Sequence, residues 1–211
     1  MLRDTAVSLL AKRLGNRTDL DDIIIEEMQN TQAFKLEQNG VFYPWFLFTE
    51  NVTTTLVIGE SRIALPADFL AEIEEEGMFV TNTDGGVSIV TKGGSQDLKV
   101  YYGSATGLPK KYALSGDHFI LFPTPDAAYV LTMRYAAAEP VLSTNIENNW
   151  LKYAADLMIA EVGATLAKTL LQNPTLAASF QTDVSRAWDR LQRQHEMLQH
   201  TNRTYTMGDS T

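Results

Sequence analysis

The fold of this chain is decided by a stretch that reads WLKYAADLMIAEVGATLA, from Trp150 to Ala167. At 3.6 residues per turn, it carries apolar side chains on more than one side of a helix. The two apolar stripes contain Trp150, Ala154, Leu157, Met158 and Ala164, and Leu151, Ala155, Ile159, Val162 and Leu166. A helix that is apolar all round is buried on all sides. The stretch therefore predicts a helix, from Thr144 or Asn145 to Asn173, at the centre of a bundle or in an interface between subunits.

A second long helix is expected to follow this one. Pro174 ends the first helix and restarts the chain as another that runs to about Thr201. Its apolar stripe contains Leu176, Phe180, Val184, Trp188, Leu191 and Leu198. Its opposite side carries Arg186, Arg190 and Arg193. These arginines either meet phosphate or an acidic partner, or form a solvated side with local pairs to Asp183 and Asp189, which is the commoner arrangement.

The N-terminal forty residues predict two more helices. Asp4 is a candidate cap for a short helix that stops at Gly15, and a longer helix is expected from Thr18 or Asp19 to Gly40. Neither helical end of the chain has enough apolar surface to build a core alone. We therefore expect the N-terminal and C-terminal helices to pack together, with the middle of the chain as an insertion.

The middle of the chain, residues 41–143, has short aromatic and β-branched runs that are separated by Gly, Pro and Asn. The candidate strands are Phe46–Thr49, Thr53–Ile58, Arg62–Leu65, Met78–Thr81, Val87–Thr91, Leu98–Tyr102, Lys111–Leu114, His118–Phe122 and Tyr129–Tyr135. The segment Asp68–Glu76 is left open as a possible helical turn. Strands at such regular spacing are typical of a small antiparallel sandwich or barrel.

The sequence thus predicts an α+β fold. Residues 1–40 and 144–201 form a four-helix bundle, residues 41–143 form an inserted antiparallel β-sandwich or barrel, and residues 202–211 form an extended tail. With 211 residues, 45% apolar and 20% charged, the chain suits one domain that carries a smaller inserted one. The tail has only Tyr205 and Met207 as apolar anchors, so alone it is expected to be disordered.

Charge and cysteine content exclude several classes of protein. The formal net charge of -9 argues against a protein whose main task is to grip nucleic acid. The absence of cysteine excludes disulfides, thiolate metal sites and a cysteine nucleophile. No run resembles a secretory signal or a membrane span, so we expect a protein that is made in the cytoplasm and contacts no membrane.

The catalytic and metal-binding patterns that the chain approaches all fail on spacing. His195 and His200 are five residues apart, whereas a zinc-protease helix needs histidines four apart on one side. The loop Gly103–Lys110 has Pro109 where a phosphate loop requires lysine. The acidic run at Glu72 and 74–76 is typical of a solvated surface. We therefore expect no enzyme activity, no catalytic residue, no metal and no cofactor.

Several short stretches carry a resemblance to a known family. These are Arg13–Leu20, Pro44–Leu47 with Thr49 and Glu50, Ala64–Leu70, Gly107–Lys110, Phe122–Pro125 and Tyr135. Together they resemble the head-to-tail adaptor proteins of tailed bacteriophages, especially of the short-tailed phages. The resemblance covers nearly the whole chain.

The resemblance implies a structural protein of the virion neck, between capsid and tail. In such adaptors many copies, usually twelve, form a ring beneath the portal, and an extended C-terminal tail docks onto the portal protein. Tail or nozzle proteins then attach, and DNA passes through the channel without specific binding. On this basis the portal-docking residues are Asn202, Arg203, Tyr205 and Met207. A ring would place at the interface between copies Leu151, Ala155, Ile159, Val162, Arg186, Arg190 and Arg193.

A second interpretation comes from another class of protein. The β insertion is rich in aromatic residues, among them Tyr101, Tyr102 and Tyr112, which are suited to a module that holds a carbohydrate or a peptide. Alternating aromatics are more often part of a core or of its rim, and a hydrolase is a distant third interpretation.

Overall fold

A computed structural model describes residues 1–38, 40, 42–49, 51–73, 77–144 and 146–203, with residues 199–203 described by their backbone. The chain is α+β and divides into two compact units. The helical unit consists of Met1–Leu47 and Ala138–Thr211, and the β unit consists of Phe48–Ala137. Each unit has a core of its own.

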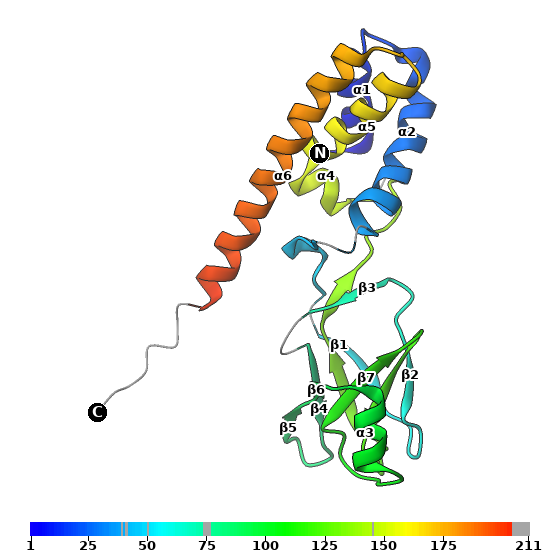
Figure 1. Cartoon of the computed structure of the whole chain (residues 1–211), viewed down its shortest axis with the longest axis vertical. Helices are drawn as coiled ribbons and strands as arrows, with labels where there is room; N and C mark the ends of the chain where they lie inside the picture. The colour runs from blue at the N-terminus through cyan, green and yellow to red at the C-terminus, as the bar shows by residue number, and fades with distance from the viewer. Residues whose placement is uncertain (39, 41, 50, 74–76, 145, 204–211) are drawn as a thin grey trace, which may run out of the picture. The chain divides into compact units, whose positions relative to one another are not determined.

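The helical unit contains segments from both ends of the chain (Figure 1). Its elements are α1 (Arg3–Arg13), η1 (Thr18–Leu20), α2 (Asp21–Asn30), η2 (Thr31–Glu37), η3 (Trp45–Leu47), α4 (Asn149–Tyr153), α5 (Ala155–Thr169) and α6 (Pro174–Arg203). The segment η2 is a π-helix that continues α2 directly, whereas η1 and η3 are single 3-10 turns.

Helix α5 is the central element of the helical unit. It contacts α1, α2, α4 and α6, and the contact with α6 is the most extensive of these (Figure 1). Its buried residues are Leu157, Met158, Ile159, Ala160, Val162, Gly163, Leu166 and Ala167. A helix that is buried on so many positions has its apolar surface covered by neighbouring helices, as all-round apolarity requires.

The described residues of the β unit form three sheets and one helix. Its elements are β1 (Val52–Thr55), β2 (Arg62–Ala64), β3 (Phe69–Glu72), β4 (Met78–Thr81), β5 (Val87–Ile89), β6 (Thr91–Lys92), α3 (Ser95–Tyr102), β7 (Lys111–Ser115), β8 (His118–Phe122), β9 (Val130–Met133) and β10 (Tyr135–Ala137). The strand orders are β1-β9-β4-β5, β10-β3 and β2-β8-β7-β6. Every pair is antiparallel except β6 with β7, which is parallel.

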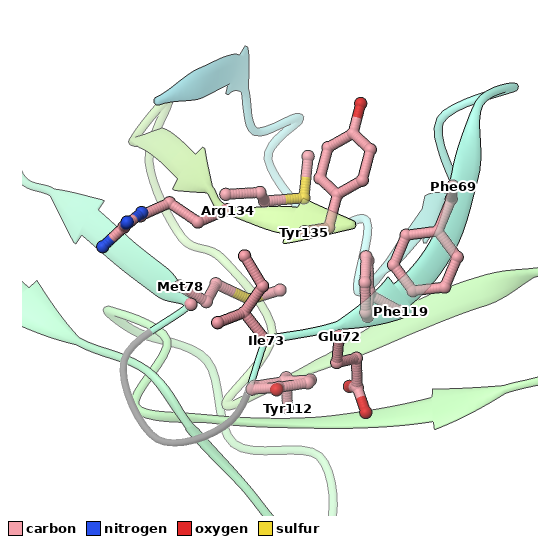
Figure 2. A pocket seen from close by; sticks show the side chains of 10 residues that line it. Phe69, Glu72, Ile73, Met78, Tyr112, Phe119, Arg134 and Tyr135 are labelled. Carbon is pink, nitrogen blue, oxygen red and sulfur yellow. The ribbon is translucent and has the colours of Figure 1, made fainter. Parts of the chain in front are cut away.

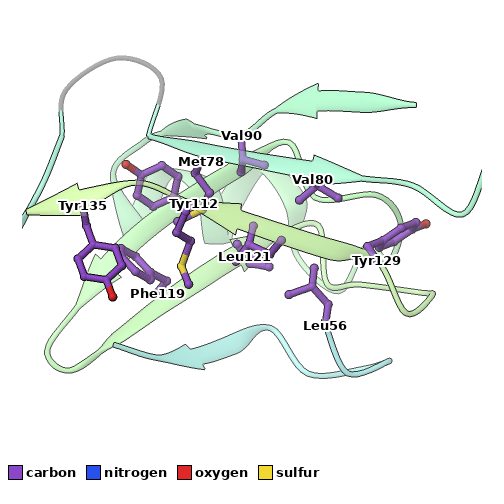
Figure 3. Packing of buried hydrophobic residues seen from close by; sticks show 11 residues of the cluster. Leu56, Met78, Val80, Val90, Tyr112, Phe119, Leu121, Tyr129 and Tyr135 are labelled. Carbon is purple, nitrogen blue, oxygen red and sulfur yellow. The ribbon is translucent and has the colours of Figure 1, made fainter. Parts of the chain in front are cut away.

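One hydrophobic cluster joins the two four-stranded sheets of the β unit (Figure 3). Val80 and Leu131 enter it from the first sheet, and Phe119 and Leu121 enter it from the second. A second cluster combines Leu98 of α3 with side chains from the other face of β7 and β8, namely Ala113 and Phe122. Because successive strand residues point to opposite faces, α3 covers the outer face of the second sheet.

Of two segments that were predicted as strands, Leu98–Tyr102 is helical, and Phe46–Thr49 is helical at Phe46 and Leu47, whereas Phe48 forms a β-bridge with Ala136. Leu98–Tyr102 belongs to α3, in which Leu98 and Tyr102 are four residues apart and pack against the second cluster. Their aromatic and β-branched composition favours a strand, but tertiary packing selects the helix. Phe46–Thr49 was also expected to be extended, yet Trp45–Leu47 forms a 3-10 turn that the amide of Leu47 closes on the Pro44 carbonyl at 3.0 Å.

The predicted helix boundaries also need correction. The helix expected from Thr144 begins only at Asn149, because the Asn148 side chain caps it by accepting from the Trp150 amide at 2.9 Å. It then breaks at Ala154, where φ is -136°, so that α4 and α5 are separate. Asp4 does not cap α1, since Leu2 occupies the N-cap position.

Candidate functional site

A buried polar cluster joins η2 to residues 139–140 and 148–150. The Glu37 carboxylate oxygen Oε1 accepts hydrogen bonds from Gln32 Nε2 at 3.0 Å, Trp150 Nε1 at 2.9 Å and the Glu139 amide at 3.2 Å. Asn148 Nδ2 donates to Gln32 Oε1 at 3.2 Å. Burial raises the pKa of Glu37, and these donors oppose that shift. The donors to the Glu37 carboxylate all belong to the described part of the chain, so we assign the cluster a structural role.

The predicted apolar interface residues lie largely inside the helical unit. Leu151, Ile159 and Val162 are buried, whereas Ala155 is half-buried. A single copy of the chain already covers these three side chains. Of the two placements that the sequence left open for this helix, the structure therefore favours the centre of the unit for them.

The three arginines of α6 lie on the surface of the helical unit. Arg186, Arg190 and Arg193 are all exposed. Their predicted pairs are not formed as expected: Asp183 pairs with Arg13 of α1, and Arg190 pairs with Asp156 of α5. The Nε of Arg193 donates to the backbone carbonyl of Asp189 at 3.1 Å. The arginines thus form an exposed basic stripe that is tied to α5 at one point.

An open groove lies beside the C-terminal half of α6. Its volume is about 490 Å³, and it is lined by Trp45, Lys152, Tyr153, Gln194, Met197 and Leu198. Lys152 is paired with Glu147 at 3.2 Å. The groove has apolar walls and a single cation, a composition that suits contact with another protein segment better than chemistry.

The β unit has a small pocket, which Figure 2 shows from close by, and most of the side chains that line it are apolar, among them Phe69, Met78 and Phe119. An adjoining hollow of about 530 Å³ is lined by Glu72, Lys92 and Tyr112, together with Ile73, Gly77, Val90 and Thr91. Lys92 pairs with Glu72. Burial and the neighbouring Glu72 carboxylate raise the pKa of Tyr112, so its hydroxyl stays protonated and acts as a donor. The charges of Lys92 and Glu72 neutralise each other, the Tyr112 hydroxyl is uncharged, and the three groups include no activated nucleophile.

Replacing Lys92 by methionine is expected to lower the stability of the β unit by less than about 1 kcal/mol, because its side chain is more than half exposed and the ion pair is screened by water. Urea unfolding followed by far-UV circular dichroism measures this change. Glu72→Gln is the matched variant, since it removes the charge on the other partner. A loss of several kcal/mol in either variant would contradict a solvent-screened pair.

The tyrosines of the binding-module interpretation are not brought into one site. Tyr101 is 81% exposed on α3, and its ring packs edge-on against Tyr102 at 4.9 Å. Tyr102 packs on the cluster beneath α3, whereas Tyr112 belongs to the cluster between the two sheets. A sugar platform needs exposed rings on one surface, and these three rings do not supply it.

The described residues contain no group of three or more His, Cys, Asp or Glu side chains that is placed to hold a metal ion. His195 is half-buried and packs against the Phe42 ring at 5.0 Å, and burial lowers its pKa. The acidic residues at positions 74–76 and the side chain of His200 lie outside the described residues. Across the described helices, none combines the length and apolarity that crossing a bilayer would require.

The predicted portal-docking residues fall at the end of the described chain. Asn202 and Arg203 belong to the last turn of α6, which is described by its backbone, and Tyr205 and Met207 lie outside the described residues. Helix α6 therefore extends two residues beyond the predicted boundary at Thr201. The contacts of these four side chains stay a prediction.

The sequence reasoning missed a surface on α3. Val100 and Tyr101 are 87% and 81% exposed, which is unusual for neighbouring large apolar residues on a short helix. The prediction of a strand for this segment did not indicate this surface, because the side chains of a strand alternate between its two faces and one of the two residues would then be buried. The four-residue spacing of Leu98 and Tyr102 is the signal that could have identified the helix.

Comparison with known protein families identifies one family that matches nearly the whole chain. The model of the SU10 adaptor protein family matches residues 4–207 of this chain. The match spans both the helical unit and the β unit. No curated protein matches the chain.

Proposed function

Since the chain belongs to the SU10 adaptor protein family, we propose that it is a structural head-to-tail adaptor that forms a ring beneath the portal of a bacteriophage virion. The family gives the chain a structural role as a phage adaptor. The observation that carries the proposal is the extent of the match, which includes both units and the first half of the segment after α6. The ring, the portal contact and the neck position are the finer parts of the proposal.

The helical unit supplies the ring in this proposal. The N-terminal and C-terminal helices act together as the four-helix bundle that the sequence predicts, and the arginines of α6 are available to a neighbouring copy. Their exposure supports this role, because a basic stripe on the surface can meet an acidic surface of another chain. The net charge of -9 lets DNA pass through the channel without being held, since like charges repel.

The C-terminal tail docks onto the portal protein. Helix α6 has 30 residues, and at 1.5 Å per residue it is about 45 Å long. Helix α6 is twice as long as α5, the 15-residue helix against which it packs. Tyr205 and Met207 are the apolar side chains of that segment and serve as its anchors, with Asn202 and Arg203 beside them. Tail or nozzle proteins attach after this step.

The double variant Tyr205→Ala and Met207→Ala is expected to bind portal rings at least about tenfold more weakly than the natural chain, because buried aromatic and large apolar anchors dominate the energy of such contacts. The measurement is co-sedimentation with portal rings over a range of adaptor concentrations. The matched control is Thr204→Ala with Thr206→Ala, which alters the same segment without removing an anchor. Equal binding by the two double variants would show that the tail does not dock through these residues.

A further inference from the structure

The first four-stranded sheet of the β unit presents an uncharged outer face. The register aligns Thr55, Val130, Thr81 and Val87 in one row across β1, β9, β4 and β5. The neighbouring row contains Thr132, Phe79 and Ile89, and the residues between the rows, such as Val80 and Leu131, enter the core. We call this side of the sheet the outer sheet face; its exposed apolar residues are Val87, Ile89 and Val130.

Helix α3 lies on the opposite side of the same unit. The hydrophobic cluster between the two four-stranded sheets lies behind the outer sheet face, and the second sheet lies behind that cluster. Helix α3 covers the far side of the second sheet through Leu98. The exposed residues of α3 are Gln96, Asp97, Lys99, Val100 and Tyr101, and we call Lys99, Val100 and Tyr101 the α3 surface. The β unit therefore has two apolar surfaces that point in opposite directions.

The two surfaces carry opposite charge at their borders. Glu60, Asp84 and Asp126 lie in loops that leave one end of the outer sheet face, next to the row of Thr55 and Val130. The amide of Gly59 donates to the Pro125 carbonyl at 2.9 Å, which holds two of these loops together.

The side of α3 is bordered by lysines instead. Lys99 is exposed on the helix, and Lys110 and Lys111 lie where β7 begins. Lys111 of β7 lies opposite Phe122 of β8 in the strand register, and the Phe122 ring contacts Tyr102 of α3. Lys110 and Lys111 therefore lie beside the C-terminal end of α3. Helix α3 also carries one acidic residue, Asp97, so the three lysines give this side of the unit a net positive charge. The α3 surface and the outer sheet face are thus complementary in charge.

We propose that copies of this chain associate head to tail through their β units, with the α3 surface of one copy seated on the outer sheet face of the next. The inference rests on the proposed ring and names one contact within it. A contact between two copies of the same surface would place lysine against lysine or carboxylate against carboxylate, which costs affinity. A contact between two different surfaces avoids this, and it closes into a ring when the rotation between copies permits.

Cross-linking between introduced thiols tests the contact, because the natural chain contains no cysteine. Val100→Cys and Val130→Cys are prepared as separate full-length variants and mixed, and a short bis-maleimide is added to the assembled rings. Covalent dimers are expected in the mixture and not in either variant alone. A chain that carries both changes is expected to form a ladder of covalent multimers. The control replaces Val130→Cys by Ser185→Cys, an exposed position on α6.

A second measurement does not depend on cross-linker reach. Val100→Asp is expected to weaken self-association at least about tenfold, since it buries a charge against an uncharged sheet. Val141→Asp is the matched control, because Val141 is also an exposed valine but belongs to the helical unit. Equal effects of the two substitutions would overturn the proposal.

The outcomes separate this contact from the proposed function. If the rings bind the portal but show no cross-link between positions 100 and 130, the contact is overturned and the adaptor function stands. The same conclusion follows if either variant alone gives as many covalent dimers as the mixture does. Multimers cross-linked at these positions without portal binding would support the contact and count against the function. A chain that stays monomeric with and without portal rings would overturn both.

Discussion

Replacing Glu37 by leucine is expected to lower the free energy of unfolding of the helical unit by about 3–5 kcal/mol, because buried donors that lose their acceptor cost about 1–3 kcal/mol each. Glu37 is 4% exposed. Its loss leaves Trp150 Nε1 and the Glu139 amide without their acceptor, whereas Gln32 Nε2 keeps the carbonyls of Glu139 and Pro140. The cavity left beside Trp150 adds to the cost.

Tryptophan fluorescence during urea unfolding measures this change selectively. The three tryptophans of the chain, Trp45, Trp150 and Trp188, all belong to the helical unit. Glu37→Gln is the matched control, because its side-chain carbonyl still accepts from the same donors. If the leucine and glutamine variants unfold at the same urea concentration, the polar cluster does not stabilise the unit.

The difference in stability between the natural chain and Glu37→Gln is expected to depend on pH. Burial raises the pKa of Glu37 in the folded state, so the folded chain binds the proton more tightly than the unfolded chain does. The stability that this group contributes is fully present below its ordinary pKa and is lost as pH rises through the raised value. The difference in stability between the natural chain and Glu37→Gln is therefore expected to decrease as pH increases from the acidic side, and an increase would contradict the burial of this carboxyl.

Replacing Gly163 by alanine is expected to destabilise the helical unit by about 1–3 kcal/mol, the usual cost of overpacking a core. A Cβ at this position would lie 2.6 Å from Cδ1 and Cζ of Phe180 on α6. Phe180 is buried, and the Arg13 guanidinium lies over its ring at 4.4 Å, so the ring has little room to move. The better helix propensity of alanine recovers part of the loss, about 1 kcal/mol at most.

The double variant Gly163→Ala with Phe180→Leu separates the clash from a general effect on α5. Phe180→Leu alone removes packing, but it also removes the ring that the new methyl group meets. In a double-mutant cycle by tryptophan fluorescence, the two changes are expected to cost less together than the sum of the single costs. Additive costs would mean that Gly163 is required for another reason.

The long periodic elements were predictable from the sequence, because their patterns depend on local spacing alone. The 3.6-residue period identified α6 and most of α5, and alternation identified strands such as β4, β7 and β8. The α+β class follows from these patterns. The helix α3 was wrongly predicted as a strand, since its composition favours a strand and only contacts with Ala113 and Phe122 decide its structure.

Other features depend on contacts between distant residues, which spacing does not reveal. The acceptor role of Glu37 toward Trp150 joins residues 113 positions apart, and the pair of Arg13 with Asp183 joins residues 170 positions apart. Asp183 was expected to pair within α6, and a partner on α1 is closer in space. For the same reason the outer sheet face became visible only once the register of four strands was known.

The portal-docking residues were reached through the resemblance rather than through chemistry. Their types, such as an aromatic and a methionine in a polar segment, are common at the ends of proteins and specify no partner. The family match over residues 4–207 supports the assignment of the chain to the adaptors without testing these positions. The docking itself has to be measured.

Sedimentation of the purified chain with the matching portal ring tests the central claim most directly. The full chain is compared with a chain that ends after Arg203, which retains all of α6. The adaptor function predicts a stoichiometric complex of the full chain with the portal ring, and loss of that complex on truncation. Failure of the full chain to sediment with the portal ring would contradict the adaptor function, and equal binding by the truncated chain would contradict docking through the tail.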